Sequence, residues 1–252
     1  MPGTELIAHR GASHDAPENT LAAFRLAWEA GADGVEGDFR LTGDGEIVCM
    51  HDAVTGRTAQ TGIPVAGSTL ARLRELDVGV WKGEKWRGEQ IPTLREVIAT
   101  VPPGKKLFIE LKSGPEILLP LAAVLAETGL APAQTVILAF SEEVVMQARQ
   151  LLPRVRGLWI TDYRMSISGW SPAIEDVLQT LGRTGAAGLA SKAHRVVDAA
   201  FVRALRDAGM ELHVWAIDAP RTAARFLTLG VDSIITNRPG WLRERLQEPT
   251  DR

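Results

Sequence analysis

The sequence predicts an α/β protein: a closed (β/α)8 barrel, the TIM-barrel architecture, with a small insertion after the second strand unit. Short apolar runs alternate with longer stretches of helical periodicity about eight times in 252 residues. No Pro- and Gly-rich linker divides the chain into halves. Polar side chains fall where the apolar runs end, and in such barrels the carboxyl ends of the strands form the rim that carries the active site.

Strands are expected where a short apolar run is bounded by turn residues or by a polar end. By this criterion they cover residues 5–9, 33–41, 46–50, 106–111, 135–140, 155–160, 186–190, 211–217 and 233–236. Helices are expected where apolar residues recur every three to four positions. They cover residues 116–127, 142–151, 198–208, 221–229 and 240–246, preceded by one helix that ends at Gly31 and one that starts within 91–94.

The first strand and the first helix have the clearest signals. Residues 5–9 read ELIAH, an apolar run with a polar end, as expected of a buried parallel strand. Asn19 or Thr20, shortly after a proline, caps the following helix, and Gly31 ends it. His9 therefore lies at the carboxyl end of the first strand.

Residues 53–90 interrupt the alternation. This segment is rich in Gly, Thr and charge, and its only clear periodic piece is 70–76. We interpret it as an insertion that carries a short helix, so residues 1–252 form a single barrel domain with an insertion at about 53–90. A second, less regular piece is expected over 161–183.

The composition excludes several classes of function. The net charge of −3 and the pI near 6.0 provide no basic surface for nucleic acid or an anionic membrane. The single cysteine, Cys49, rules out an intrachain disulfide and a thiolate zinc cluster. The first residues lack the features of a signal peptide, and no apolar run approaches the roughly 18 residues of a membrane span. We expect a cytoplasmic protein.

Two pairs of charged residues suggest a metal site. Glu36 and Asp38 are two positions apart, so a strand places both on one face. Two carboxylates facing a barrel interior would repel each other unless a cation lay between them, and Mg²⁺ or Ca²⁺ is the natural partner of oxygen ligands. Glu110 and Lys112 repeat the spacing and would add a third ligand and a cation for phosphate. The alternatives are a solvated edge strand for the first pair and a rim salt bridge for the second.

Two histidines at strand ends are candidates for proton transfer. His9 is followed by Arg10, whose guanidinium offers a fork of donors suited to phosphate oxygens. His51 is followed by Asp52, which could orient its ring. Both imidazoles could exchange a proton near neutral pH. The alternative for each is a structural role, which is the more frequent one for a single strand-end histidine.

Other residues have weaker claims to a role in the site. Trp215 could wall a pocket of glycerol size at the rim, or it could pack in the core. Cys49 lies between apolar neighbours and is expected to be buried and inert. His213 could face outward from its strand, and His14 and His194 are expected in loops.

Several spaced blocks of the sequence resemble one enzyme family. HRG, PENTLAAF and GADGVEGDFRLTGDGEIVCMHD resemble the signature region of the glycerophosphodiester phosphodiesterases. The similarity continues through Arg57-Thr58, LRELDVGVWKGEKWRGEQIPTLREVI, FIELK, HVWAID and VDSIITNRP. It therefore covers nearly the whole chain, and residues 155–195 are the least characteristic part.

The resemblance implies a metal-dependent enzyme that splits glycerophosphodiesters into glycerol 3-phosphate and an alcohol. It implies one divalent cation, Mg²⁺ or Ca²⁺, and a small-molecule substrate, and it leaves the oligomeric state open. Its site residues fall on His9 and His51 for acid–base catalysis, on Arg10, Lys112 and Trp215 for the substrate, and on Glu36, Asp38 and Glu110 for the metal.

Two positions depart from the common pattern of this family. Gly37 stands where a larger residue is usual, and Asn237 stands where Asp is frequent. Neither change removes a catalytic group, so we expect activity. Two other functions stay open: a lysophospholipase D-type hydrolase, which would need an apolar face on the insertion near Trp81 and Trp86, and a non-catalytic barrel that binds phosphate esters.

Overall fold

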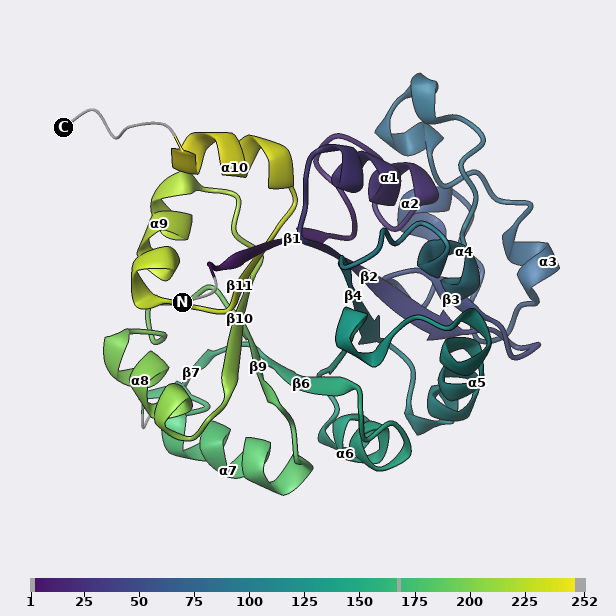
Figure 1. Cartoon of the computed structure of the whole chain (residues 1–252). Coiled ribbons are helices and arrows are strands. Elements are labelled where there is room, and N and C mark those ends of the chain that lie inside the picture. The colour runs from purple at the N-terminus through teal and green to yellow at the C-terminus, as the bar shows by residue number, and fades with distance from the viewer. Residues whose placement is uncertain (1–2, 167–168, 248–252) are drawn as a thin grey trace.

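A closed parallel barrel occupies the centre of the molecule (Figure 1). The computed structural model describes residues 3–166 and 169–247, and within these ranges eight parallel strands form the ring. In order around the ring, they are β1 (Glu5–His9), β2 (Gly34–Leu41), β4 (Lys106–Leu111), β5 (Thr135–Ala139), β6 (Arg156–Thr161), β9 (Gly188–Lys192), β10 (Glu211–Trp215) and β11 (Ser233–Thr236). The ring closes because β1 pairs with both β11 and β2. The predicted (β/α)8 barrel is confirmed.

Helices surround the barrel (Figure 1). They are α1 (Leu21–Glu29), α4 (Leu94–Ile98), α5 (Leu118–Thr128), α6 (Glu142–Leu151), α7 (Ile174–Thr184), α8 (Ala199–Asp207), α9 (Pro220–Leu229) and α10 (Pro239–Gln247). Their starts follow local chemistry: the side chains of Thr20, Ser141 and Asp198 accept hydrogen bonds from the first turn, and Thr93 and Glu96 form a capping box. Among the described residues, none of the helices is both long and apolar enough to cross a membrane.

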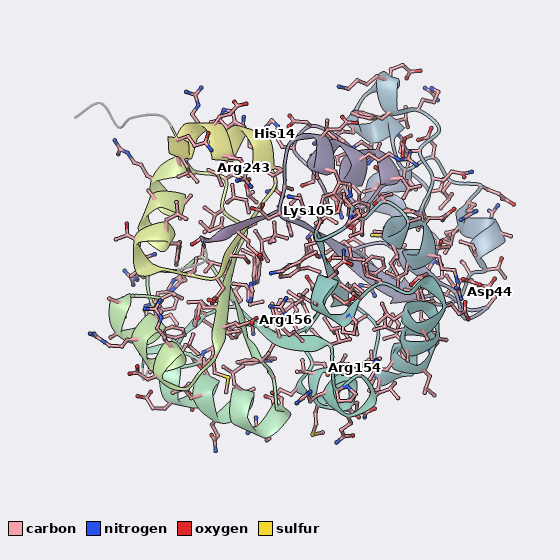
Figure 2. All side chains as sticks on the ribbon, viewed as in Figure 1. His14, Asp44, Lys105, Arg154, Arg156 and Arg243 are labelled. Atoms are coloured by element: carbon pink, nitrogen blue, oxygen red, sulfur yellow. The ribbon has the colours of Figure 1, made fainter. Side chains whose placement is uncertain are left out.

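Two sets of apolar side chains pack the barrel. Alternation along each strand separates them: in β4, Phe108 belongs to the interior cluster, whereas Leu107 and Ile109 pack against the helices. The interior cluster consists of Ile7, Phe108, Val136, Leu138, Leu158, Ile160, Ala190 and Ile235. Side chains fill the space that the strands enclose (Figure 2), so the barrel is a packed core and polar chemistry is left to its rim.

The insertion, residues 53–90, lies outside the ring, at the upper right of Figure 1. The short strand β3 (Ile47–Cys49) pairs antiparallel with β2 and leads the chain out to it. Its helices are α2 (Gly56–Ala59), α3 (Leu70–Leu73) and the 3-10 turns Val80–Lys82 and Glu84–Trp86. A separate buried cluster attaches it to β3; this cluster consists of Val48, Met50, Ala59, Val65, Leu73, Leu76, Val78 and Ile91. The insertion follows the second strand of the ring, as predicted.

The stretch expected to be irregular, 161–183, is more ordered than the sequence indicated. Strands β7 (Arg164–Ser166) and β8 (Gly169–Ser171) form a hairpin, whose residues 167–168 lie outside the described part of the chain, and α7 follows. The buried face of α7 includes Thr180 and Thr184 beside Val177 and Leu181. Ile174, Val177, Leu178 and Leu181 recur at helical spacing, so the sequence did contain the signal for this helix.

Candidate active site

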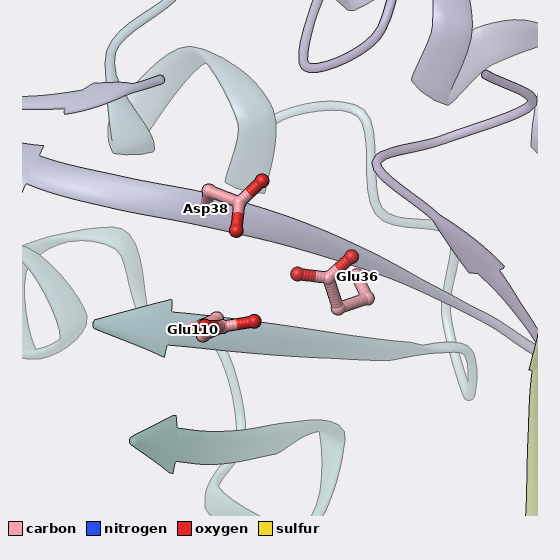
Figure 3. Close-up of side chains that lie close together, drawn as sticks. All are labelled: Glu36, Asp38 and Glu110. Carbon is pink, nitrogen blue, oxygen red and sulfur yellow. The ribbon is translucent and has the colours of Figure 1, made fainter. Parts of the chain in front are cut away.

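Strand register brings three carboxylates together at the rim. Asp38 in β2 is paired with Glu110 in β4, and Glu36 in β2 is paired with His9 in β1. Glu36 and Asp38 extend from the same face of β2, and one oxygen from each of the three acids lies within 4.8 Å of the others (Figure 3). The two-residue spacing in β2 and the register between β2 and β4 thus produce one cluster from segments that are more than 70 residues apart in the sequence.

The acid cluster has the properties of a divalent-cation site. Glu36 and Asp38 are buried, and Glu36 Oε1 has no hydrogen-bond partner among the described residues. Burial and the charge of Asp38 raise the pKa of Glu36 to about 8 and that of Glu110 to about 7. Three carboxylates that repel each other in this way, with lone pairs left free, fit a hard cation that takes oxygen ligands.

Two cations border the acids. Arg10 Nε lies 3.1 Å from Asp38 Oδ2, and Lys112 Nζ lies 3.1 Å from Asp38 Oδ1 while it also pairs with Glu110. Burial works to raise the pKa of Asp38, but Lys112 and Arg10 outweigh it and lower that pKa to about 2. Arg10 takes a left-handed conformation, with φ of 56°, and its backbone N–H donates to Glu36 Oε2 at 2.9 Å. The first strand therefore ends in a turn that is fixed by the acid cluster itself.

An amide orients His9. Asn237 Nδ2 donates to Asp218 Oδ2 at 2.7 Å, so Asn237 Oδ1 must face His9 Nδ1, which lies 2.8 Å away. Because an amide oxygen only accepts, the imidazole carries its proton on Nδ1 and presents a bare Nε2. Burial and the charge of Arg10 lower the pKa of His9, which keeps this form neutral. Ser13 supports the arrangement with a 2.9 Å hydrogen bond to Asn237 Oδ1.

A carboxylate orients His51. Its Nδ1 lies 2.7 Å from Asp52 Oδ1, so this nitrogen donates and Nε2 is free for chemistry. The pKa of His51 is also lowered, because burial outweighs the charges of Asp38 and Asp52, which act in the opposite direction. The two histidines therefore differ in kind, because one is held by a neutral amide and the other by an anion.

A cavity of about 250 Å³ joins these groups. One half is polar and is lined by His9, Arg10, Glu36, His51, Glu110 and Lys112. The other half is apolar and includes Trp215 and Phe140, whose rings meet edge to face at 6.2 Å. Trp215 also donates from Nε1 to Ala190 O at 3.1 Å, which fixes it as a wall of the cavity. One half of the cavity thus has cations and imidazoles that can bind an anion and exchange a proton, and the other half is suited to carbon atoms.

The structure adds residues that the sequence reading missed or left undecided. Thr20, not Asn19, caps α1; Asn19, with φ of 60°, instead donates to Asp38 Oδ2 at 2.8 Å and accepts from the Asp38 backbone N–H at 3.1 Å. Asp218 orients Asn237, and Arg40 donates to His51 O at 2.7 Å. The position of Asp218 within HVWAID, at the end of a strand, was the available signal for it.

The other histidines and Cys49 lie apart from this cavity. His213 does not face outward: it is buried beside Phe108, and its Nδ1 lies 2.8 Å from Ser233 Oγ. The even spacing from Trp215 places both rings on the interior side of β10, which corrects the expectation. His14 and His194 lie in loops, as expected. Cys49 is buried, and burial raises the pKa of its thiol.

Gly37 lies in a tight space between the two acids. A Cβ at this position would come within 3.0 Å of Phe24 Cζ and 3.1 Å of Cys49 Sγ. The glycine therefore allows α1 and β3 to approach the strand that carries Glu36 and Asp38.

The fold and site together define a class of protein: a barrel hydrolase of small phosphate esters with an acidic cluster for a divalent cation. The model of the glycerophosphoryl diester phosphodiesterase family matches residues 9–241. The chain belongs to this family and is a glycerophosphodiester phosphodiesterase.

Similar proteins agree with this identification. A glycerophosphodiester phosphodiesterase of Caldanaerobacter subterraneus is 33% identical, with 94% of this chain and 95% of the relative covered. One from Bacillus subtilis is 30% identical, with 92% of this chain and 83% of the relative covered. A solved structure of an Oleispira antarctica phosphodiesterase, in complex with the product sn-glycerol-3-phosphate, has a TM-score of 0.87 at 28% identity and covers 97% of each chain.

Proposed function

We propose that this enzyme hydrolyses glycerophosphodiesters to glycerol 3-phosphate and an alcohol, with His9 and His51 as acid–base groups. The observation that carries the proposal is that both histidines, each with an orienting partner, line one cavity with Arg10 and Lys112. The product bound in the Oleispira enzyme supports the choice of substrate class.

The polar half of the cavity binds the phosphate in this proposal. Arg10 and Lys112 donate to the non-bridging oxygens and offset negative charge as it grows at phosphorus. Glu36, Asp38 and Glu110 would hold one Mg²⁺ or Ca²⁺ ion, which when bound supplies Lewis-acid charge to the same oxygens. Trp215 would contact the carbon atoms of the substrate.

The different partners of the histidines assign their roles. His9 is neutral, its Nε2 is bare, and its partner is an amide, so we assign it as the base that takes the proton of the attacking hydroxyl. Asp52 stabilises a protonated His51, so His51 is the acid that gives its proton to the leaving alcohol oxygen. If the neighbouring glycerol hydroxyl attacks, a cyclic phosphate forms; water then opens it while the histidines exchange roles.

The test is release of glycerol 3-phosphate from glycerophosphocholine and glycerophosphoethanolamine. We expect product with added Mg²⁺ or Ca²⁺, and loss of activity with a chelator. His9→Ala and His51→Ala should each lower kcat by about 10²–10⁴-fold in a folded protein. Wild-type rates for both variants would rule out the acid–base assignment, and full activity in chelator would rule out the cation.

Several features favour a water-soluble substrate over a lysophospholipid. Trp81 and Trp86 of the insertion are half-buried, and a lysine ammonium lies over each ring, Lys82 at 5.5 Å and Lys85 at 4.8 Å. Such capped rings are a poor surface for an acyl chain.

We further propose that residues 1–252 act as one domain, that the enzyme is cytoplasmic and that it binds no nucleic acid.

A further inference from the structure

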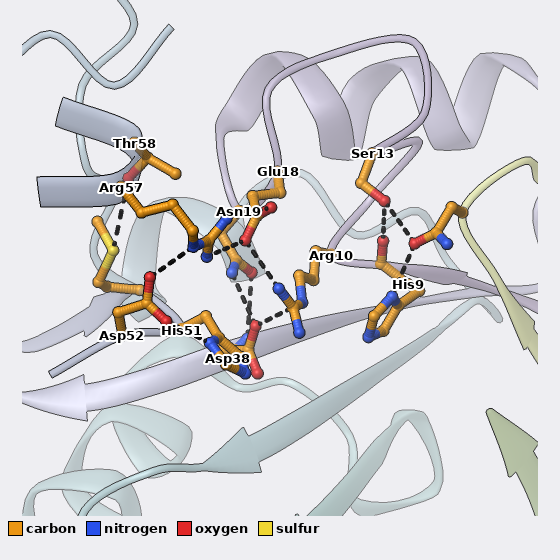
Figure 4. Close-up of polar contacts among 12 residues, drawn as sticks. His9, Arg10, Ser13, Glu18, Asn19, Asp38, His51, Asp52, Arg57 and Thr58 are labelled. Carbon is orange, nitrogen blue, oxygen red and sulfur yellow. Dashed lines mark hydrogen bonds and ion pairs between the residues drawn. The ribbon is translucent and has the colours of Figure 1, made fainter. Parts of the chain in front are cut away.

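Arg57, in helix α2 of the insertion, contacts two carboxylates that belong to different parts of the barrel rim. Its Nε donates to Asp52 Oδ2 at 2.6 Å, and its Nη1 and Nη2 donate to the two oxygens of Glu18 at 2.9 and 2.8 Å (Figure 4). Three of the five N–H donors of its planar guanidinium group thus bind carboxylate oxygens.

Each of these carboxylates has its other contact with a residue of the proposed site. The second oxygen of Asp52 lies 2.7 Å from His51 Nδ1. Glu18 Oε1, besides its bond to Arg57, accepts from Arg10 Nη1 at 2.8 Å. Arg57 is therefore linked through the Asp52 carboxylate to His51, the proposed acid. It is linked through the Glu18 carboxylate to Arg10, the proposed phosphate-binding arginine.

We infer that Arg57 is a positioning residue, which fixes His51 through Asp52 and Arg10 through Glu18. The inference rests on the proposed function of those two residues. A carboxylate bound only to His51 could rotate about its own side-chain bonds, and the guanidinium plane removes that freedom. Displacement of a reacting group by about 1 Å can cost about 100-fold in rate.

The same contacts contribute little to folding. The Arg57 side chain is 45% exposed and that of Asp52 is 31% exposed, and ion pairs in such surroundings are worth about 0–1 kcal/mol. The Glu18 side chain is only 13% exposed, but it keeps Arg10 as an ion-pair partner when Arg57 is removed. Removal of the guanidinium also leaves no cavity in the core. A defect in Arg57 variants should therefore appear in catalysis and not in stability.

The experiment measures kcat and KM for glycerophosphoethanolamine with saturating Mg²⁺ or Ca²⁺ in Arg57→Met, Arg57→Lys and His51→Ala, and in the Arg57→Met/His51→Ala double variant. The matched control is Arg87→Met, because Arg87 is an exposed arginine of the insertion whose ion pair within the described ranges is with Glu84, at 2.6 and 2.8 Å. Thermal melting of each variant checks the fold.

We expect Arg57→Met to lower kcat by about 10–100-fold, as loss of a residue behind a functional side chain often does. Arg57→Lys should recover part of kcat, since an ammonium can hold one carboxylate but not both in fixed planes. In the His51→Ala background, Arg57→Met should lower kcat by a clearly smaller factor than in wild type, because no imidazole remains to be positioned and only the Glu18–Arg10 branch is left. Arg57→Met should also raise KM, because Glu18 is then no longer held in place against Arg10, and this rise should persist in the His51→Ala background. Arg87→Met should behave as wild type.

An equal loss of kcat in both backgrounds, or wild-type activity in Arg57→Met, would overturn the inference. A different pattern identifies failure of the proposed function itself. If His51→Ala alone keeps wild-type kcat, the proton transfer is wrong and the inference falls with it. If His51→Ala loses activity and Arg57→Met does not, only the inference is wrong.

Discussion

Single residues determine how the rim can move protons. His9 and His51 are the same amino acid, but Asn237 holds one and Asp52 holds the other. A histidine paired with an anion holds a proton more readily than one paired with a neutral amide, so the first can start the reaction as the acid and the second as the base. This difference leads to a prediction on leaving groups.

The requirement for an acid should depend on the alcohol released. His51→Ala should lower kcat by about 10²–10⁴-fold for glycerophosphoethanolamine but much less for a nitrophenyl ester of glycerol phosphate, whose leaving group departs without a proton. His9→Ala should impair both substrates. Steady-state rates of the two variants on the two substrates provide the comparison. The reverse pattern would assign the acid to His9.

Gly37 lies where even a methyl side chain would be crowded. Gly37→Ala would push a methyl group to within about 3 Å of Phe24 and Cys49, which are both buried. We expect a loss of about 1–3 kcal/mol in the free energy of unfolding, the usual cost of overpacking. Urea unfolding measures it. Gly31→Ala is not a suitable control because its φ is 75°; Gly182→Ala on α7, with open space around it, is suitable and should not lose stability.

Ion pairs between elements close the end of the barrel opposite the active site. Arg156 Nη1 of β6 (labelled in Figure 2) lies 3.1 Å from Glu211 Oε1 of β10. The other carboxylate oxygen of Glu211 lies 3.2 Å from His213 Nε2. Burial opposes ionisation of Glu211, but His213 and Arg156 outweigh it and lower its pKa to about 2. This end of the barrel should therefore respond to acid.

Glu211 should stabilise the fold at neutral pH and lose that effect in acid. A carboxyl whose pKa is lowered on folding contributes stability above its usual pKa, 4.5, and the contribution disappears as pH falls towards about 2. Because the group is only half-buried, we expect about 1–2 kcal/mol. Glu211→Gln should lower the melting temperature at pH 7 and leave it nearly unchanged at pH 2. An equal difference at both values would contradict the prediction.

At the scale of the whole molecule, the acid cluster opposes folding when no cation is bound. The raised pKa of Glu36, about 8, shows that its charge is unfavourable at pH 7. A cation that binds the folded chain adds stability by mass action. Stability and the metal site are therefore linked through the same three side chains.

Mg²⁺ or Ca²⁺ should raise the melting temperature of the wild-type protein, and Glu36→Gln should remove most of that rise. In chelator, Glu36→Gln should itself melt about 2–4 °C above wild type, because wild type must take up a proton or bury this charge at pH 7, which costs about 1 kcal/mol. Calorimetry with and without cation makes the comparison, with the exposed Glu244→Gln as control. The prediction is wrong if the cation stabilises Glu36→Gln as much as it stabilises wild type.

Local patterns determined much of the fold. The spans 106–111 and 142–151 were predicted to the residue, because one is a bounded apolar run and the other an amphipathic helix with Ser141 as cap. Helix α7 was not predicted, although its apolar residues recur at helical spacing; what the sequence does not show is that Thr180 and Thr184 of this helix are buried. Burial is a property of the packed molecule and not of the residue type.

The sequence by itself determined the barrel and proposed the acids and histidines of the rim, since spacing along a strand fixes the face on which a side chain lies. Only the tertiary structure decided which neighbours each of them has. In the folded chain, Asp38 lies opposite Glu110 in the neighbouring strand and accepts a hydrogen bond from Asn19. Arg57 donates hydrogen bonds to both Asp52 and Glu18. These contacts join segments that are far apart in the chain. Strand register and loop closure set their geometry, and neither is encoded by a local sequence pattern.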